Sequence, residues 1–315
     1  METIGGTPNP DNSRRDFIKK LGIFLAATLV APNSVFSKST LEKTDNRPVK
    51  SVEMTEMPDQ GNLHEGFVRR KVNLEFDDSK GKIEGAGSFF SLEDETKGQA
   101  QFLSNKSHPD LFKNGVDFDA IKTHYTALGQ NVTLVVAGAY YAPGTKEIEG
   151  VALEDGVMVG QDTAKSGSNG LLVIKDGKPE IEYVNQIPDF PTYLTDLKNE
   201  KADAFQQTSY IRPGGAFTSS NPKQWELRFF VEGTVNGVTK KGVLNFSTAM
   251  TYTEAVEAMK KMSGITITKA IGLDTGDMSE GYFYDKTDKK YLMIDEQSGT
   301  HRDEYTNVLV LCSKQ

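Results

Sequence analysis

The alternation of apolar and polar residues after position 62 predicts a domain built mainly from short strands. Residues 132–137 (VTLVVA) form a continuous apolar run that ends at Gly138, as expected for a strand buried on both faces. Residues 307–312 (NVLVLC) have the same character. We therefore expect both segments to lie in the interior of a sheet.

Three pairs of strand-like runs are separated by short polar turns. Two of the turns contain Asp-Gly or Asn-Gly, which favour tight β-hairpins because both residues accept a positive φ. The pattern predicts three hairpins: residues 171–174 with 181–184 around Asp176 and Gly177, residues 226–231 with 242–246 around Asn236 and Gly237, and residues 282–284 with 291–294 around a Lys-Thr-Asp-Lys-Lys turn.

Helical periodicity is clearest over residues 252–263, where Thr251 and Glu254 have the spacing of a capping box and Gly264 is expected to end the helix. Residues 119–128 predict a second helix and residues 193–198 a short third one. Strands outnumber helices, and hairpins replace regular β-α-β alternation. The sequence therefore predicts an α+β fold, a mixed, hairpin-rich sheet with a few packed helices.

The first residues have the pattern of an export signal. Ser13, Arg14, Arg15, Phe17 and Lys19 resemble the bacterial twin-arginine consensus. The apolar run that follows, residues 21–31, is shorter than the roughly 20 residues that a membrane-spanning helix needs. We expect residues 1–37 to be a twin-arginine signal peptide. The alternatives are a buried core helix with a chance arginine pair and an uncleaved anchor.

The remaining chain divides by composition. Residues 38–62 are polar and non-periodic and predict a linker, whereas residues 63–315 predict a single folded domain. A twin-arginine signal implies that the twin-arginine translocase exports the protein already folded. We therefore expect a periplasmic or secreted bacterial protein with no stable membrane anchor.

Composition excludes several classes of function. The net charge of -8 and the lack of a Lys/Arg cluster exclude nucleic acid as a partner. The single cysteine, Cys312, excludes an internal disulfide. The four histidines lack metal-ligand spacing, and neither a Gly-x-Ser-x-Gly motif nor a phosphate-binding loop is present.

Four segments carry motifs in a fixed order: VVAGAYY at 135–141, GVALEDG at 150–156, LRFFVEG at 227–233 and GLDTGDMS at 272–279. The last follows a predicted helix and strand, which places Asp274 at the carboxyl end of that strand. In order and spacing these segments resemble the phosphodiester glycosidase family, whose motifs are Asn-Gly-Gly-Phe-Phe, Gly-Leu-x-x-x-x-Gly, Arg-Thr-Ala-Ile-Gly and Asn-Leu-Asp-Gly-Gly-Gly-Ser. The resemblance covers roughly residues 131–311.

The resemblance implies an exported hydrolase that cleaves a sugar-1-phosphodiester in envelope or extracellular glycan. Ala137 and Gly272 stand where the family has Asn, and Thr275 and Asp277 stand where it has Gly. The two Asn replacements remove amide groups that could orient a sugar or a phosphate. A second interpretation therefore stays open, a non-catalytic glycan or glycan-phosphate binding protein on the same fold.

Two retained residues would carry the reaction. The planar guanidinium of Arg228 can hold two phosphate oxygens, and Asp274 can serve as the catalytic carboxylate. A structural alternative exists for each. Arg228 could pair with Glu226 or Glu232, and Asp274 could be a turn residue that accepts backbone N–H groups.

The remaining candidates would bind the substrate. Adjacent strand residues point in opposite directions, so only one of Tyr140 and Tyr141 is expected to contact ligand. The other predicted substrate-binding residues are Gly138, Gly276, Asp277, Ser279 and Arg212.

A cation and a protease remain to be considered. Asp274, Asp277 and Glu280 share one loop that could hold Ca²⁺ or another divalent cation, with a solvated acidic loop as the alternative. Asp274-Thr275-Gly276 also matches the aspartic protease triplet. That chemistry needs two carboxylates from two such loops, and the chain has one.

Overall fold

The computed structural model describes residues 47–56, 63–78, 81–113, 115–142, 145–274, 281–286, 288–294 and 306–314. All of them belong to one compact unit, Thr44–Gln315. The predicted signal peptide lies outside the described residues, as do Gly276, Asp277 and Ser279. In the described part, no helix is long and apolar enough to cross a membrane. The fold is α+β, as predicted.

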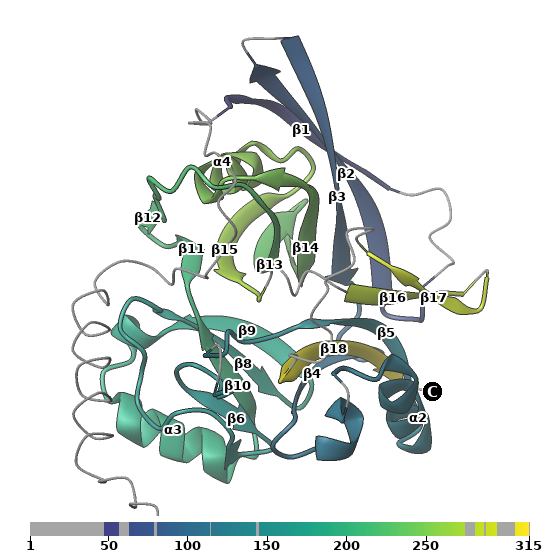
Figure 1. Ribbon diagram of the computed structural model, residues 1–315, viewed down its shortest axis with the longest axis vertical. Coiled ribbons are helices and arrows are strands. Elements are labelled where there is room, and N and C mark those ends of the chain that lie inside the picture. The colour runs from purple at the N-terminus through teal and green to yellow at the C-terminus, as the bar shows by residue number, and fades with distance from the viewer. Residues whose placement is uncertain are drawn as a thin grey trace, which may run out of the picture. The chain divides into compact units, whose positions relative to one another are not determined.

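The largest sheet has eight strands, and every pairing in it is antiparallel (Figure 1). Its order is β1 (Val49–Glu56), β2 (Phe67–Asp78), β3 (Gly81–Leu92), β14 (Val238–Met250), β13 (Trp225–Val235), β15 (Thr266–Gly272), β11 (Ser209–Arg212) and β12 (Gly215–Ala216).

Strand β1 corrects the predicted linker. Residues 49–56 lie within the polar stretch 38–62, yet they pair with β2 from Val49 opposite Phe76 to Glu56 opposite Arg70. Buried Val52 and half-buried Met54 alternate with exposed Glu53 and Thr55, and Val49 is buried as well because the register shifts between Val49 and Ser51. Two buried valines are too few to stand out from the polar residues around them, so the composition of the segment concealed the strand.

Two five-stranded sheets complete the fold, and their pairings are also antiparallel. One has the order β7 (Val157–Met158), β6 (Ala152–Glu154), β10 (Asp203–Gln207), β8 (Gly170–Lys175) and β9 (Lys178–Tyr183). The other has the order β17 (Lys290–Met293), β16 (Gly281–Asp285), β5 (Gln130–Ala137), β18 (Asn307–Lys314) and β4 (Gly98–Ser104).

The three predicted hairpins are confirmed as β8–β9, β13–β14 and β16–β17. Asp176 and Gly177 have φ of 51° and 77°, and Asn236 and Gly237 have φ of 50° and 78°. Two consecutive positive φ angles give the turn whose twist matches the two strands that it joins. The two predicted buried strands are β5 and β18, which pair with each other.

The helices are α2 (Phe118–Ala127), α3 (Phe190–Asn199) and α4 (Tyr252–Lys261), with short 3₁₀ turns at η2 (Pro109–Phe112) and η3 (Val184–Gln186). The predicted capping box of α4 is present, with Thr251 accepting from the Glu254 N–H and Glu254 accepting from the Thr251 N–H. The prediction that Gly264 ends α4 is wrong. The helix ends before Met262, which is extended because it is buried and bridges to Val52 of β1.

The core divides between the two faces of the eight-stranded sheet. Side chains alternate along β13, so Phe229 joins the cluster that α4 covers, and Phe230 joins the cluster shared with the two five-stranded sheets. Helix α2 covers a cluster on β5 and β18, and α3 covers one on β6, β8 and β10. This division determines which polar side chains are enclosed between the sheets.

Candidate functional site

The predicted site residues converge at the end of β15. The N–H of Leu273 donates to the Arg228 carbonyl oxygen, the N–H of Asp274 donates to the Gly138 carbonyl oxygen, and the N–H of Gly272 donates to the Thr208 carbonyl oxygen, each at 2.9 Å. Three segments that are far apart in the sequence therefore contact three consecutive residues, 272–274. In parallel sheets, ligands commonly bind in a crevice at the carboxyl ends of the strands. Because β15 is antiparallel to both of its neighbours, that rule does not explain the position of this site.

Arg228 is enclosed between the sheets and is only 1% exposed. On β13 it shares the face of Phe230, opposite the face that α4 covers. Its Nε donates to Oδ1 of Asn245 at 3.0 Å, and Asn245 is its partner in the β13–β14 register. The Asn245 Nδ2 donates in turn to Ser247 Oγ at 3.2 Å. The guanidinium is thus oriented by a buried amide.

Glu232 is one of the two carboxylates that could pair with Arg228 in a purely structural role, and it has other partners. Glu232 forms an ion pair with Lys269 at 2.9 Å and also accepts from the Ile181 N–H. At the start of β16, a Cβ added to Gly281 would lie 3.2 Å from Arg228 Nη2. A larger residue at position 281 would therefore press on the guanidinium.

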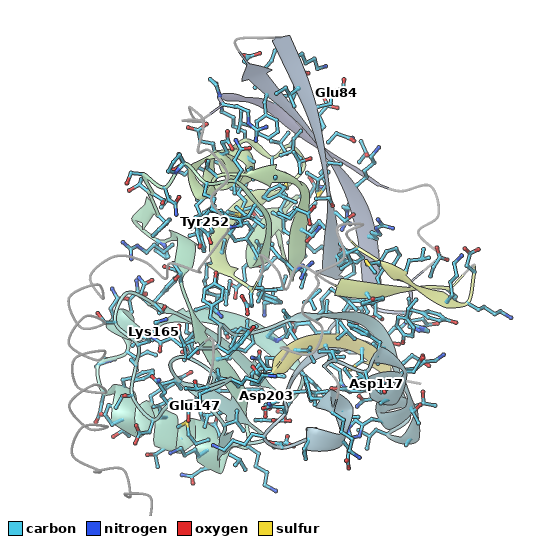
Figure 2. All side chains as sticks on the ribbon, viewed as in Figure 1. Glu84, Asp117, Glu147, Lys165, Asp203 and Tyr252 are labelled. Carbon is cyan, nitrogen blue, oxygen red and sulfur yellow. The ribbon has the colours of Figure 1, made fainter. Side chains whose placement is uncertain are left out.

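A group of three tyrosines adjoins Asp274. The hydroxyl of Tyr140 hydrogen-bonds with those of Tyr210 and Tyr252, and the Tyr210 and Tyr252 rings stack at 5.2 Å. We call Tyr140, Tyr210 and Tyr252 the tyrosine cluster. Figure 2 labels Tyr252, the first residue of α4. The cluster brings together the loop after β5, the strand β11 and the helix α4.

Burial raises the pKa of Tyr140 and of Tyr210 well above the usual range of a phenol. Burial also raises the pKa of Tyr252, and the nearby Asp274 carboxylate adds to the increase for Tyr140 and Tyr252. The three hydroxyls therefore keep their protons at neutral pH. They are hydrogen-bond donors that lie close to a carboxylate.

Gly272 makes room for the tyrosine cluster. A Cβ at this position would lie 2.8 Å from Tyr210 Cε2 and 3.1 Å from Tyr140 Oη. The absence of a side chain where the resemblance led us to expect Asn is thus explained by the space that two tyrosines occupy.

Asn307 positions the loop that carries Gly138 and Tyr140. Its Oδ1 accepts from the Ala139 N–H at 2.6 Å, and its Nδ2 donates to the Ala139 carbonyl at 3.0 Å. A Cβ added to Gly138 would lie 2.7 Å from the same Oδ1. Gly138 therefore serves close packing and supplies a carbonyl to Asp274.

The two neighbouring tyrosines separate as alternation predicts. Tyr140 joins the tyrosine cluster, whereas Tyr141 bridges to Ile148 and packs against the cluster beneath α2. Tyr141 is thus directed away from the end of β15.

A cavity of about 250 Å³ lies beside this site. It is lined by Gly167, Asn169, Thr208, Ser209, Arg212 and Phe217. Arg212 is the predicted site residue among them. Among the described residues, no group of three or more His, Cys, Asp or Glu side chains could hold a metal ion. Asp277 and Glu280 lie outside these residues, so the cation site stays a prediction.

Sequence reasoning missed Asn245, Asn307, Tyr210 and Tyr252. Asn245 interrupts an apolar run on β14, and a lone amide in a buried strand could have indicated a polar partner. Tyr252 offered no such signal, because the first turn of a helix gives no sign of which strand it contacts.

Comparisons with known proteins give likenesses in structure but none in sequence. No family model matches the sequence, and no curated protein matches it. Among solved structures, the catalytic domain of zebrafish N-acetylglucosamine-1-phosphodiester alpha-N-acetylglucosaminidase, auto-inhibited by its pro-peptide, is 12% identical with a TM-score of 0.49. The match covers 86% of this chain and 89% of that one. Identity and TM-score this low decide neither family nor activity.

Proposed function

We propose that this protein is a hydrolase that cleaves a sugar-1-phosphodiester at the end of β15. The observation that supports this function best is the placement of the Asp274 carboxylate. It lies near enough to the protonated hydroxyls of Tyr140 and Tyr252 to raise the pKa of each, and it follows by two residues the strand that pairs with the strand of Arg228. A carboxylate and hydrogen-bond donors held together by packing are what glycosyl transfer to water requires.

The reaction breaks the bond between the anomeric carbon and the phosphate oxygen. Water supplies the hydroxyl that the anomeric carbon gains, and its proton goes to the departing phosphate. Asp274 acts as base or nucleophile at the anomeric carbon. The tyrosine hydroxyls donate to substrate oxygens, and Arg228 supplies positive charge that offsets the charge of the phosphate.

The test is release of free sugar from a sugar-1-phosphate diester by the purified protein. We expect Asp274→Asn to lower kcat by roughly 10²–10⁴-fold, the usual contribution of a positioned acid or base. Asp196→Asn, an exposed aspartate of α3, is the matched control and should leave kcat unchanged. Turnover by Asp274→Asn at the wild-type rate would remove Asp274 from the reaction.

A second function is favoured by the burial of Arg228. Because its guanidinium is 1% exposed and its Nε is bound to Asn245, a purely structural role for this arginine fits the geometry as well. The protein would then bind a glycan or glycan-phosphate without cleaving it. Calorimetric binding of the diester with no sugar released would support this second function and exclude the first.

We also propose that the protein is exported through the twin-arginine translocase to the periplasm or beyond. Support comes from the sequence around Arg14 and Arg15. Replacing both arginines with lysine should retain the protein in the cytoplasm, as cell fractionation would show. Unchanged export of this variant would contradict the proposal.

A further inference from the structure

We propose that the cavity beside the tyrosine cluster binds a sugar ring that carries a carboxylate, so that the substrate is an acidic glycan. As a statement about the substrate, this proposal rests on the proposed function, whereas the binding of a ligand in the cavity can be tested independently of it. Its lining combines one guanidinium, three small polar side chains and one aromatic ring.

The size of the cavity suits a single ring. Pockets that enclose drug-sized molecules have volumes of about 300–1,000 Å³. At about 250 Å³, this cavity lies just below that range. One sugar unit fits such a volume, and the remainder of a glycan would extend outside it.

The charge of the cavity selects a monoanion. Arg212, an exposed residue at the end of β11, is the one cationic residue in the lining, and none of the ion pairs seen among the described residues includes it. Lys165, which precedes the lining residue Gly167 by two positions and is labelled in Figure 2, is instead paired with Glu149. A single planar guanidinium matches one carboxylate in a two-hydrogen-bond geometry. A phosphate monoester carries nearly twice that charge, and the phosphodiester of the proposed substrate, which is also a monoanion, is already assigned to the bond that Asp274 attacks.

The polar lining is already oriented. The Ser209 hydroxyl donates to Asn169 Oδ1 at 2.6 Å, which orients the amide and leaves the hydroxyl oxygen able to accept. An amide and two hydroxyl side chains, those of Thr208 and Ser209, offer the mixed donors and acceptors that sugar hydroxyls require.

Phe217, the aromatic residue of the lining, is fixed in place by a contact with Tyr210. Phe217 packs edge-to-face on Tyr210 with ring centroids 5.1 Å apart, so it presents a positioned apolar surface to the cavity. The C–H face of a sugar ring packs well against such a surface. Phe217 also connects the cavity to the tyrosine cluster, because Tyr210 hydrogen-bonds with Tyr140.

The cavity and the reaction site are close enough to share one ligand. Thr208 lines the cavity, and its carbonyl accepts from the Gly272 N–H at 2.9 Å. Asp274 follows Gly272 by two residues, a span of at most about 7 Å along the chain. A sugar in the cavity can therefore be the unit next to the bond that Asp274 attacks.

The test compares three small ligands by calorimetry with the full-length protein: glucuronic acid, glucose and glucose 6-phosphate. We expect glucuronic acid to bind at least 10-fold more tightly than glucose and more tightly than glucose 6-phosphate. Arg212→Gln should raise the Kd for glucuronic acid about 10-fold and leave the Kd for glucose unchanged. Lys178→Gln, an exposed lysine of β9, is the matched control and should alter neither.

Equal binding of glucuronic acid and glucose, or an Arg212→Gln variant that binds like the wild type, would overturn the proposal. Tighter binding of glucose 6-phosphate would overturn the assignment of a carboxylate. Asp274→Asn separates this inference from the proposed function, because it should lower kcat by roughly 10²–10⁴-fold and leave the Kd for glucuronic acid unchanged. Binding of glucuronic acid without any sugar release would leave the cavity assignment intact and contradict the hydrolase.

Discussion

At the scale of single residues, small side chains make the site possible. Gly138 and Gly272 both lie where an added Cβ would come within 3 Å of a neighbouring atom. Gly272 faces the tyrosine cluster, and Gly138 faces Asn307. The sequence identifies both glycines, but which atoms require them to be small depends on segments far away in the chain.

Gly272→Ala should destabilise the protein by about 1–3 kcal/mol, because the new methyl group would displace Tyr210 and Tyr140. Urea unfolding measures the change. Gly215→Ala is the matched control, since a Cβ at Gly215 meets no atom within 4 Å. It should change stability by less than about 0.5 kcal/mol. Equal free energies of unfolding for the two variants would show that the tyrosine cluster does not pack against Gly272.

Asp203 gives the protein a pH dependence. Burial raises the pKa of this carboxyl from 3.8 to about 7, although N–H groups of Asp155 and Phe102 donate to it. Figure 2 labels Asp203, which lies on β10. Between pH 4 and 7 the folded protein keeps a proton that the unfolded chain has released. The stability contributed by this group is therefore complete below about pH 4 and is lost as the pH rises to 7.

The difference between the two pKa values corresponds to on the order of 4 kcal/mol. Thermal unfolding across this pH range should show the decline. In Asp203→Asn the decline should become shallower, because the titrating group is gone. The variant should also be less stable at pH 4 by about 1–3 kcal/mol, since an amide NH₂ would face one of the two N–H donors. A wild-type slope in the variant would assign the pH dependence to other groups.

At the scale of elements, the start of α4 links stability to the site. Thr251 and Glu254 cap the helix, and Glu254 also pairs with Arg47 at 3.0 Å. Tyr252 is the first residue of the same helix and belongs to the tyrosine cluster. Loosening the first turn of α4 should therefore disturb the donors beside Asp274.

Thr251→Ala should cost about 1 kcal/mol of stability, as is typical for loss of an N-cap side chain. It should also lower kcat for the proposed reaction, because Tyr252 would lose its fixed position. Glu257→Ala, at an exposed position of the same helix, is the control and should change neither quantity. Chemical unfolding and sugar release measure the two effects. Full activity in a destabilised Thr251→Ala protein would exclude Tyr252 from the site.

At the scale of the whole molecule, β1 extends the folded unit beyond the domain that composition indicates. A chain that begins at Arg47 should fold like the full-length protein. A chain that begins at Pro58 lacks β1, exposes the edge of β2 and loses the buried side chains of Val49 and Val52. Each buried valine contributes roughly 1.5–3 kcal/mol.

We expect the shorter chain to unfold at a lower temperature and to aggregate through its new edge strand. Circular dichroism and size-exclusion chromatography measure these properties. Equal melting temperatures for the two chains would show that β1 adds nothing to the fold.

The sequence by itself determined the elements that depend on local chemistry. The turns at Asp176-Gly177 and Asn236-Gly237, the capping box of α4 and the apolar strands β5 and β18 follow from the φ preferences, side-chain reach and apolar runs of neighbouring residues. It also predicted that Tyr140 and Tyr141 point in opposite directions, because that alternation belongs to the extended backbone.

Only the tertiary structure decided what those elements meet. It placed Arg228 on Asn245, Tyr140 with Tyr210 and Tyr252, and Thr208 beside Gly272. It also recruited β1 from a polar stretch into the sheet. Each of these contacts joins residues whose separation along the chain carries no periodic signal. Strand order, register and close packing across the sheets therefore determined the site.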